Sequence, residues 1–248
     1  MLKHVFSGGI CVAVVLVAVA LAQPAPHRRP APQAAPAATT QNHSPVELNA
    51  VLTRMDQAAE KFRTTQADFV WDQYSKVVNE TDTQKGTLYF RRTKSGVEMA
   101  AHITEPAVKY VLFRDGKARV YEPNIDQETV YNAGKNKADF ESFLVLGFGG
   151  GGHELEKSFD VRYLGKEEAM GVNADQLELI PKSQRVRNTF SQILLWIDPA
   201  RGVSVQQKLL EPSGDYRLAK YSNIQINARI PDSIFKLKTT GKTRVISP

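Results

Sequence analysis

The chain has 248 residues, of which 42% are hydrophobic and 23% are charged, so its composition is that of a soluble globular protein with one core of normal size. Its net charge of +6 would permit a nucleic-acid partner, but the 32 basic residues are interspersed with 26 acidic ones and no long run of like charge occurs. The single cysteine, Cys11, excludes an internal disulfide.

The first 22 residues have the pattern of a signal peptide. Lys3 supplies a short positive region, and residues 10–21 form an apolar run that ends in Ala-Leu-Ala, which predicts cleavage before Gln23. The run is shorter than the roughly 20 apolar residues of a transmembrane anchor. A lipid attached at Cys11 would need a small residue before it, where the chain has isoleucine. We therefore expect residues 1–22 to be removed and the mature protein to be exported to the periplasm without an anchor, which argues against nucleic-acid binding.

A flexible segment and a helix are expected next. Residues 23–44 are rich in proline and alanine, a composition that favours an extended tether without a core of its own. Residues 44–47, Ser-Pro-Val-Glu, form a capping box with proline at the first helical position. Apolar residues then recur at helical spacing as far as Phe62, while charged residues occupy the other face. This pattern predicts an amphipathic helix that covers an apolar surface.

From residue 67 onward, the apolar period changes to two. Short alternating segments are separated by turn residues, for example Arg-Asp-Gly-Lys at 114–117, as in an antiparallel meander. We count about ten or eleven strands and two main helices. A single sheet of this size curls, and partial closure into a barrel is the usual outcome. The predicted fold class is therefore α+β, mainly β, with an incomplete antiparallel β-barrel.

Residues 136–148 break the alternation and are predicted to form a second helix. The glycines that follow spell G-x-G-x-x-G over residues 147–152, the pattern of a dinucleotide-binding loop. Such a loop needs a strand before it and a helix after it, whereas here we expect a helix before it and a strand after it. A helix stop in an ordinary surface loop and a hinge for the preceding helix remain as interpretations. The hinge candidates are Gly149, Gly150, Gly151 and Gly152.

Catalytic and metal-binding motifs are absent from the sequence. Residues 23–248 contain no cysteine, no G-x-S-x-G, no H-E-x-x-H and no C-x-x-C. Beyond the tether, the histidines are His102 and His153, and we expect His102 to be structural or exposed. Nothing in the sequence places a general acid beside a general base. We therefore predict that the protein is not an enzyme and needs no cofactor or metal.

The order of motifs over residues 46–246 resembles a known family. An amphipathic helix is followed by ADFVWDQ, GTLYFRR, HITEP, RDGKARVYEPNIDQETV, an apolar helix, LELIPK and IPDSIFKLKTTGKTRVI. This succession resembles the periplasmic outer-membrane lipoprotein carrier LolA and related lipoprotein-sorting proteins. The resemblance implies that residues 45–248 form one domain, in which helices cover the open mouth of the incomplete barrel.

The resemblance also implies a function. A carrier of this kind is a monomer that holds the acyl chains of lipoproteins or lipids in an apolar cavity between the sheet and a helical lid. It receives its cargo from an inner-membrane ABC transporter complex and passes it to an acceptor at the outer membrane. Arg92 matches the arginine that tethers the lid in the family, although Thr93 follows it where the family often has proline.

Large apolar side chains of the helices and strands are the candidates to line the cavity, with a packed core as the alternative for each. They are Leu52, Met55, Phe69, Trp71, Leu88, Phe90, Met99, Ile103, Tyr110, Leu112, Phe140, Phe143 and Leu144. Two other functions remain open: a periplasmic sensor or adaptor that binds a protein partner or a free lipid, and an enzyme that acts on lipids or envelope glycans.

Overall fold

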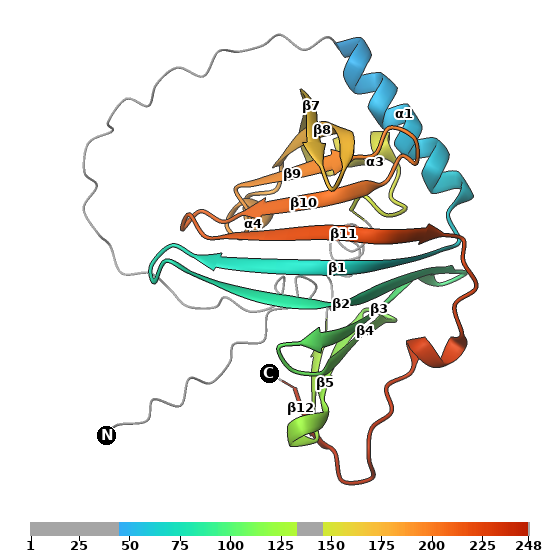
Figure 1. Cartoon of the computed structure of the whole chain (residues 1–248), viewed down its shortest axis with the longest axis vertical. Helices are drawn as coiled ribbons and strands as arrows, with labels where there is room; N and C mark the ends of the chain where they lie inside the picture. Colours follow the sequence, from blue (N-terminus) through green and yellow to red (C-terminus); the bar gives the residue numbers. More distant parts are fainter. Residues whose placement is uncertain (1–44, 133–145, 248) are drawn as a thin grey trace.

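A curved sheet of twelve strands dominates the part of the chain that the structure, a computed structural model, describes, namely residues 45–132 and 146–247 (Figure 1). The first half contains α1 (Pro45–Lys61), β1 (Thr64–Ser75), β2 (Glu80–Thr93), β3 (Gly96–Glu105), β4 (Lys109–Arg114), β5 (Lys117–Glu122), η1 (Pro123–Ile125) and β6 (Gln127–Asn132). The second half contains α3 (Gly152–Ser158), β7 (Phe159–Ala169), β8 (Val172–Pro181), α4 (Gln184–Arg187), β9 (Gln192–Ile197), β10 (Ser204–Leu210), β11 (Tyr216–Ile226), η3 (Asp232–Phe235) and β12 (Arg244–Ile246).

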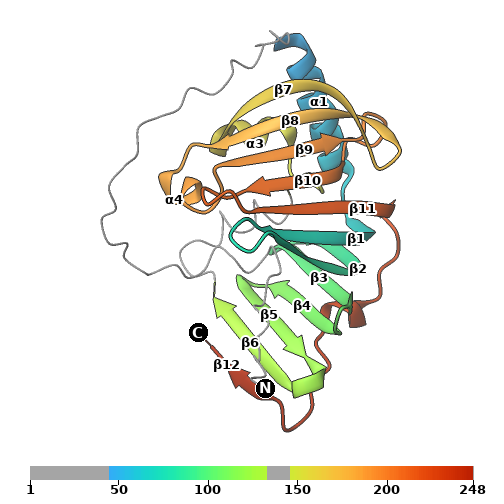
Figure 2. The same cartoon turned by 60° about the vertical axis from the view of Figure 1, so that its left-hand side comes forward.

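The sheet consists of two antiparallel meanders that join at one seam. The strand order is β12-β6-β5-β4-β3-β2-β1-β11-β10-β9-β8-β7, so β1 and β11 lie side by side at the middle (Figure 2). At this seam Phe69 pairs with Tyr221 and Trp71 pairs with Ala219. Only the short β12 runs parallel to its neighbour among the described strands. The order does not return to its first strand, so the sheet is open. The prediction of a mainly β, unclosed antiparallel barrel is therefore confirmed, with twelve strands instead of about ten or eleven.

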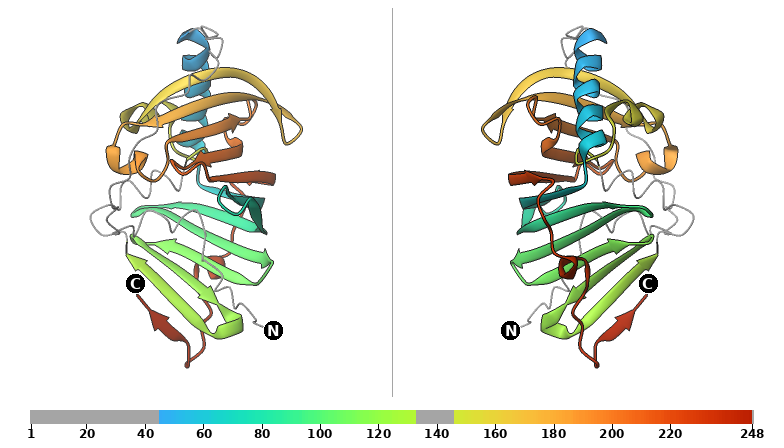
Figure 3. Two further views of the ribbon diagram at one scale, coloured as in Figure 1. Left: turned by 90° about the vertical axis from the view of Figure 1, so that its left-hand side faces the viewer. Right: turned by 90° about the vertical axis from the view of Figure 1, so that its right-hand side faces the viewer.

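Helix α1 lies across the β7–β11 half of the sheet (Figure 3). Its buried side chains follow the helical repeat, and Val51, Leu52 and Met55 pack with leucines and isoleucines of β8 and β9 in one apolar cluster, which we call the second cluster. The buried residues of α1 are Val51, Leu52, Met55 and Ala59. Of the described helices, none is long and apolar enough to span a membrane.

The face of the sheet opposite α1, which we call the far face, carries its own cover. Phe235 of η3 packs on Leu112 and Ala100, and the Arg91 guanidinium lies 4.1 Å from the centre of its ring. On the same face, the His102 ring makes edge-to-face contacts with two tyrosine rings, with centroid distances of 5.2 and 5.1 Å. Burial lowers the pKa of His102. This histidine therefore lies within an aromatic row on the far face.

The region around the glycines differs from the prediction. The helix predicted for 136–148 falls mostly on residues 133–145, outside the described residues, and its last three residues form a turn. A short helix, α3, follows Gly151, where we expected a strand. The sequence His-Glu-Leu-Glu-Lys favours a helix, but a run this short gives little periodic signal and its helical state depends on packing. α3 packs against α1 through Gly152, where an added Cβ would come within 2.2 Å of the Leu52 carbonyl oxygen.

Candidate functional site

The face of the sheet that meets Phe62 and Phe148, which we call the lid face, carries a continuous apolar surface. Strand alternation places Met99, Ala101 and Ile103 on this face of β3, and pairing places Val111 and Phe113 beside them on β4. These side chains, with others from β1, β2, β5 and β11, form a first apolar cluster. It is a surface that could accept a long hydrocarbon chain wherever its own cover can move away.

The segment 146–151 lies on this surface. The Phe148 ring stacks on Phe90 at a centroid distance of 5.6 Å and meets Tyr221 edge-to-face at 4.6 Å. Phe148 is 1% exposed, and burial raises the pKa of Tyr221. Phe148 therefore fills the middle of the first cluster as an inserted aromatic side chain.

Few polar contacts fasten this segment to the sheet. The Ser204 amide donates to the Gly147 carbonyl oxygen at 2.8 Å, and the Gln207 side-chain amide donates to the Leu146 carbonyl oxygen. Gly147 has φ +78°, and its added Cβ would come within 2.4 Å of the Ser204 Cβ. Only glycine can make this close approach without strain.

Arg92 contacts the same segment from the end of β2. Its Nη2 donates to the Gly149 carbonyl oxygen at 2.8 Å, and its guanidinium lies 5.3 Å from the centre of the Phe62 ring. Arg92 itself is exposed. The contact has the geometry that a lid latch requires, and the latch role stays a prediction.

The glycine run also packs closely against α1. An added Cβ at Gly149 would lie 2.6 Å from the Phe62 ring, and one at Gly151 would lie 2.9 Å from an Asp56 carboxylate oxygen. Gly150 lies between them in a bend. Gly149 and Gly152 therefore need glycine for close approach, and Gly149 needs it also for its φ of +128°. The hinge role stays a prediction.

His153 ties α3 to α1. Its backbone amide donates to an Asp56 carboxylate oxygen at 3.2 Å, while its ring nitrogens contact the Asp56 carboxylate and, at 3.0 Å, the Asn49 amide oxygen. The role of His153 has no local signal in the sequence, since nothing near it indicates that α1 lies beside it. Across residues 45–132 and 146–247, no three His, Cys, Asp or Glu side chains gather into a possible metal site.

The predicted cavity residues fall into four groups. Those in or against the first cluster are Phe69, Trp71, Leu88, Phe90, Met99 and Ile103. Leu52 and Met55 belong to the second cluster. Phe140, Phe143 and Leu144 lie outside the described residues. The last group is Tyr110 and Leu112.

The assignment of Tyr110 and Leu112 to the same cavity is wrong. They face the far side of the sheet, because Tyr110 pairs with His102 and Leu112 pairs with Ala100. The apolar neighbours of β4 on the lid face are instead Val111 and Phe113. All these positions of β4 are apolar or aromatic, so alternation alone could not tell which set faces the lid.

Three buried donor groups on two residues of the lid face lack an acceptor within the described part of the chain. The Trp71 indole nitrogen has no hydrogen-bond partner, and neither have Nε and Nη1 of Arg217. Arg217 lies opposite Gln73 on the neighbouring strand, next to the Trp71–Ala219 pair. Its Nη2 contacts a Glu211 carboxylate oxygen at 2.7 Å. Hydrogen-bond donors without acceptors are therefore available at one end of a mainly apolar face.

Together these features define an open antiparallel sheet whose apolar face is covered by segment 146–151. The family model described as outer membrane lipoprotein carrier protein LolA matches residues 60–238, and the chain belongs to this family.

Two solved structures illustrate the likeness of fold. MucB superposes with a TM-score of 0.51 at 14% identity, over 78% of this chain and 63% of the MucB chain. An uncharacterized conserved protein from Thermus thermophilus superposes with a TM-score of 0.52 at 10% identity, over 82% of this chain and 99% of that chain. At these identities the likeness shows the fold alone. No curated protein sequence matches the chain.

Proposed function

We propose that the protein is a periplasmic carrier that binds the acyl chains of lipoproteins on the lid face and moves them from the inner to the outer membrane. Family membership supports this proposal. The observation that carries it is the placement of Phe148, an aromatic side chain from a lightly fastened segment that fills the centre of the apolar face. An acyl chain could take the place of this side chain without breaking the sheet.

The magnitudes favour such an exchange. Each buried methylene contributes about 0.8 kcal/mol, so a palmitoyl chain gains on the order of 12 kcal/mol when fully buried. Exposing Phe148 costs roughly 3 kcal/mol, and breaking the contacts at Leu146, Gly147 and Gly149 costs about 1 kcal/mol each. Burial of the palmitoyl chain is therefore more favourable than displacement of segment 146–151 is costly. The cost of displacing this segment lowers the net affinity and makes release easier.

The rest of the proposal follows the family. The protein would act as a monomer without enzymatic activity or a cofactor, with the signal peptide at 1–22, the tether at 23–44 and one carrier domain at 45–248. It would receive lipoproteins from an inner-membrane ABC transporter complex and deliver them to an outer-membrane acceptor. It would thus serve as a chaperone in outer-membrane biogenesis.

A fluorescent palmitoyl probe tests the proposal directly. We expect the protein to bind the probe, and Phe148→Ala to bind it about tenfold or more tightly, because exposure of a phenylalanine no longer opposes entry. Phe235→Ala is the matched control, since Phe235 is equally buried but lies on the far face. No saturable binding by the folded wild type would refute the proposal, and equal affinities of wild type and Phe148→Ala would remove Phe148 from the site.

A second candidate is an adaptor that binds a protein partner. The observation that favours it is the exposed apolar tip of the β1–β2 hairpin, where Val77 is 89% and Val78 is 60% exposed. Mass spectrometry of the purified protein separates the two: bound acylated peptide or phospholipid supports the carrier, and a stoichiometric protein supports the adaptor.

A further inference from the structure

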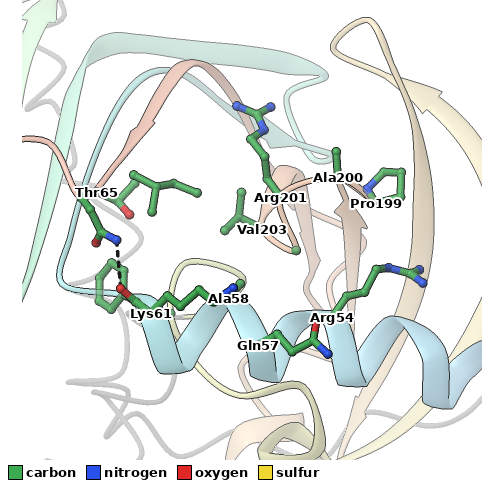
Figure 4. A pocket seen from close by; sticks show the side chains of 14 residues that line it. Arg54, Gln57, Ala58, Lys61, Thr65, Pro199, Ala200, Arg201 and Val203 are labelled. Atoms are coloured by element: carbon green, nitrogen blue, oxygen red, sulfur yellow. Dashed lines mark hydrogen bonds between the residues drawn. The ribbon is translucent and has the colours of Figure 1, made fainter.

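A pocket of about 350 Å³ opens beside the C-terminal half of α1. Figure 4 shows α1 as one wall, with the turn between β9 and β10 facing it. The ends of β1 and β11 contribute Thr65, Ile226 and Asn227. The residues of α1 that line the pocket lie outside its buried stripe, and of the members of the two apolar clusters only Phe62 lines it.

The lining carries positive charge and no carboxylate. Lys61, Arg54 and Arg201 line the pocket, and none of the fourteen lining residues is Asp or Glu. Arg54 and Arg201 contact Asp175 and Asp198, which lie outside the lining. The Lys61 ammonium group has no carboxylate within ion-pair distance in the described part of the chain, and its side chain lies along α1 at one side of the pocket (Figure 4).

Thr65 supplies an unused hydrogen-bonding group at this pocket. The residue is 1% exposed, and its hydroxyl is buried with no hydrogen-bond partner within residues 45–132 and 146–247. A buried polar group without a partner costs free energy, so such a group usually meets a ligand or water. Because Thr65 lines a pocket that also carries Lys61, its hydroxyl fits an oxygen-rich anion better than a neutral apolar group.

The end of α1 does not oppose an anion here. The last carbonyl groups of a helix carry partial negative charge, but those at this end are engaged. The Arg63 guanidinium donates to the carbonyl oxygens of Glu60 and Phe62, and the Asn227 side-chain amide donates to that of Lys61 at 2.9 Å. The helix terminus therefore repels an anion in the pocket only weakly.

The pocket adjoins the proposed acyl site through two shared residues. Phe62 and Gly149 line the pocket. Phe62 also belongs to the first apolar cluster, and the Gly149 carbonyl oxygen accepts the hydrogen bond from Arg92. The pocket and the proposed acyl site therefore adjoin at Phe62 and Gly149.

From this arrangement we propose that the pocket binds the anionic group, a phosphate or a carboxylate, of a ligand whose acyl chains occupy the lid face. The proposal rests on the proposed carrier function and specifies the polar end of its cargo. Lys61 binds the anion by charge and Thr65 donates its hydroxyl to it. The two arginines are paired with Asp175 and Asp198, so Lys61 supplies the positive charge that an anion would meet.

The test compares two fluorescent diacyl probes with identical chains, phosphatidylglycerol and uncharged diacylglycerol. We expect the wild type to bind the phosphatidylglycerol probe about tenfold more tightly, the usual effect of one charge-assisted hydrogen bond. Lys61→Gln and Thr65→Val should each lose most of this preference and keep the affinity for diacylglycerol. Lys238→Gln, an exposed lysine on the C-terminal segment, is the charge-matched control and should behave as wild type.

The results with the two probes separate the pocket proposal from the carrier function. Equal affinities of the wild type for both probes, or a preference that Lys61→Gln and Thr65→Val retain, would overturn the pocket proposal and leave the carrier function intact. If neither probe binds, the carrier function fails, and titration with inorganic phosphate then tests the pocket alone. Phosphate-induced NMR shifts at Thr65 and Lys61 that Lys61→Gln abolishes would support a free oxyanion as the ligand, and unchanged spectra would overturn the pocket.

Discussion

Replacement of Arg92 by alanine tests whether this side chain holds segment 146–151 on the lid face. The substitution removes one hydrogen bond to the Gly149 carbonyl oxygen and the contact of the guanidinium with the Phe62 ring. At an exposed site, each is worth about 0.5–1 kcal/mol. The cover should therefore loosen by about 1–2 kcal/mol, which multiplies its open fraction by roughly 5 to 30. The sheet should stay intact because the two side-chain contacts that are lost join Arg92 to Gly149 and Phe62, which lie outside the strands.

Hydrogen exchange at single amides measures this loosening. The Ser204 amide donates to the Gly147 carbonyl oxygen, so its exchange rate reports how often segment 146–151 leaves the sheet. We expect faster exchange at Ser204 in Arg92→Ala and no change in the strand amides of the seam, such as Phe69. Lys94→Ala, at an exposed neighbouring position, is the control. Equal Ser204 exchange in the wild type and Arg92→Ala would refute the latch.

Two further substitutions test packing and charge. Gly152→Ala should destabilise the fold by about 1–3 kcal/mol in thermal unfolding, because its Cβ would meet the Leu52 carbonyl oxygen at 2.2 Å; Gly241→Ala, which meets nothing within 4 Å, should change little, and equal effects would contradict the packing role. Burial would raise the pKa of Asp198, but hydrogen bonds from Arg201 and the Ala200 amide lower it overall. Because this pKa is lower in the folded than in the unfolded state, Asp198 stabilises the fold above the unfolded pKa of about 4, and this contribution is lost as the pH falls through the folded pKa. Asp198→Asn should therefore reduce the loss of stability on acidification below about pH 4, and an unchanged pH profile would contradict this assignment.

The strands were predictable because their signals are local. The turn at Asp115 and Gly116 has positive φ values at both residues, 52° and 73°, which the residue types Asp and Gly favour. The alternation that precedes and follows such turns sets strand length. The open sheet then follows from the number of strands, since a sheet of this size curls.

The site was less predictable because it depends on distant parts of the chain. The lid side of β4 is chosen by its pairing with β3, which its own alternation does not show. The glycine run indicated backbone freedom, but the contact of Gly152 with Leu52 arises only when α3 meets α1. Phe148 was included in a predicted helix, and its insertion between Phe90 and Tyr221 has no local signal.

The seam between β1 and β11 has a consequence for how the chain acquires its shape. Each meander can assemble from hairpins between sequence neighbours, but the seam joins Phe69 to Tyr221, near opposite ends of the chain. Contacts so distant in sequence form slowly. The sheet face that would bind the ligand is therefore complete only after β11 has paired with β1. A nascent polypeptide that ends before Tyr216 could form hairpins and still lack a site for a hydrocarbon tail.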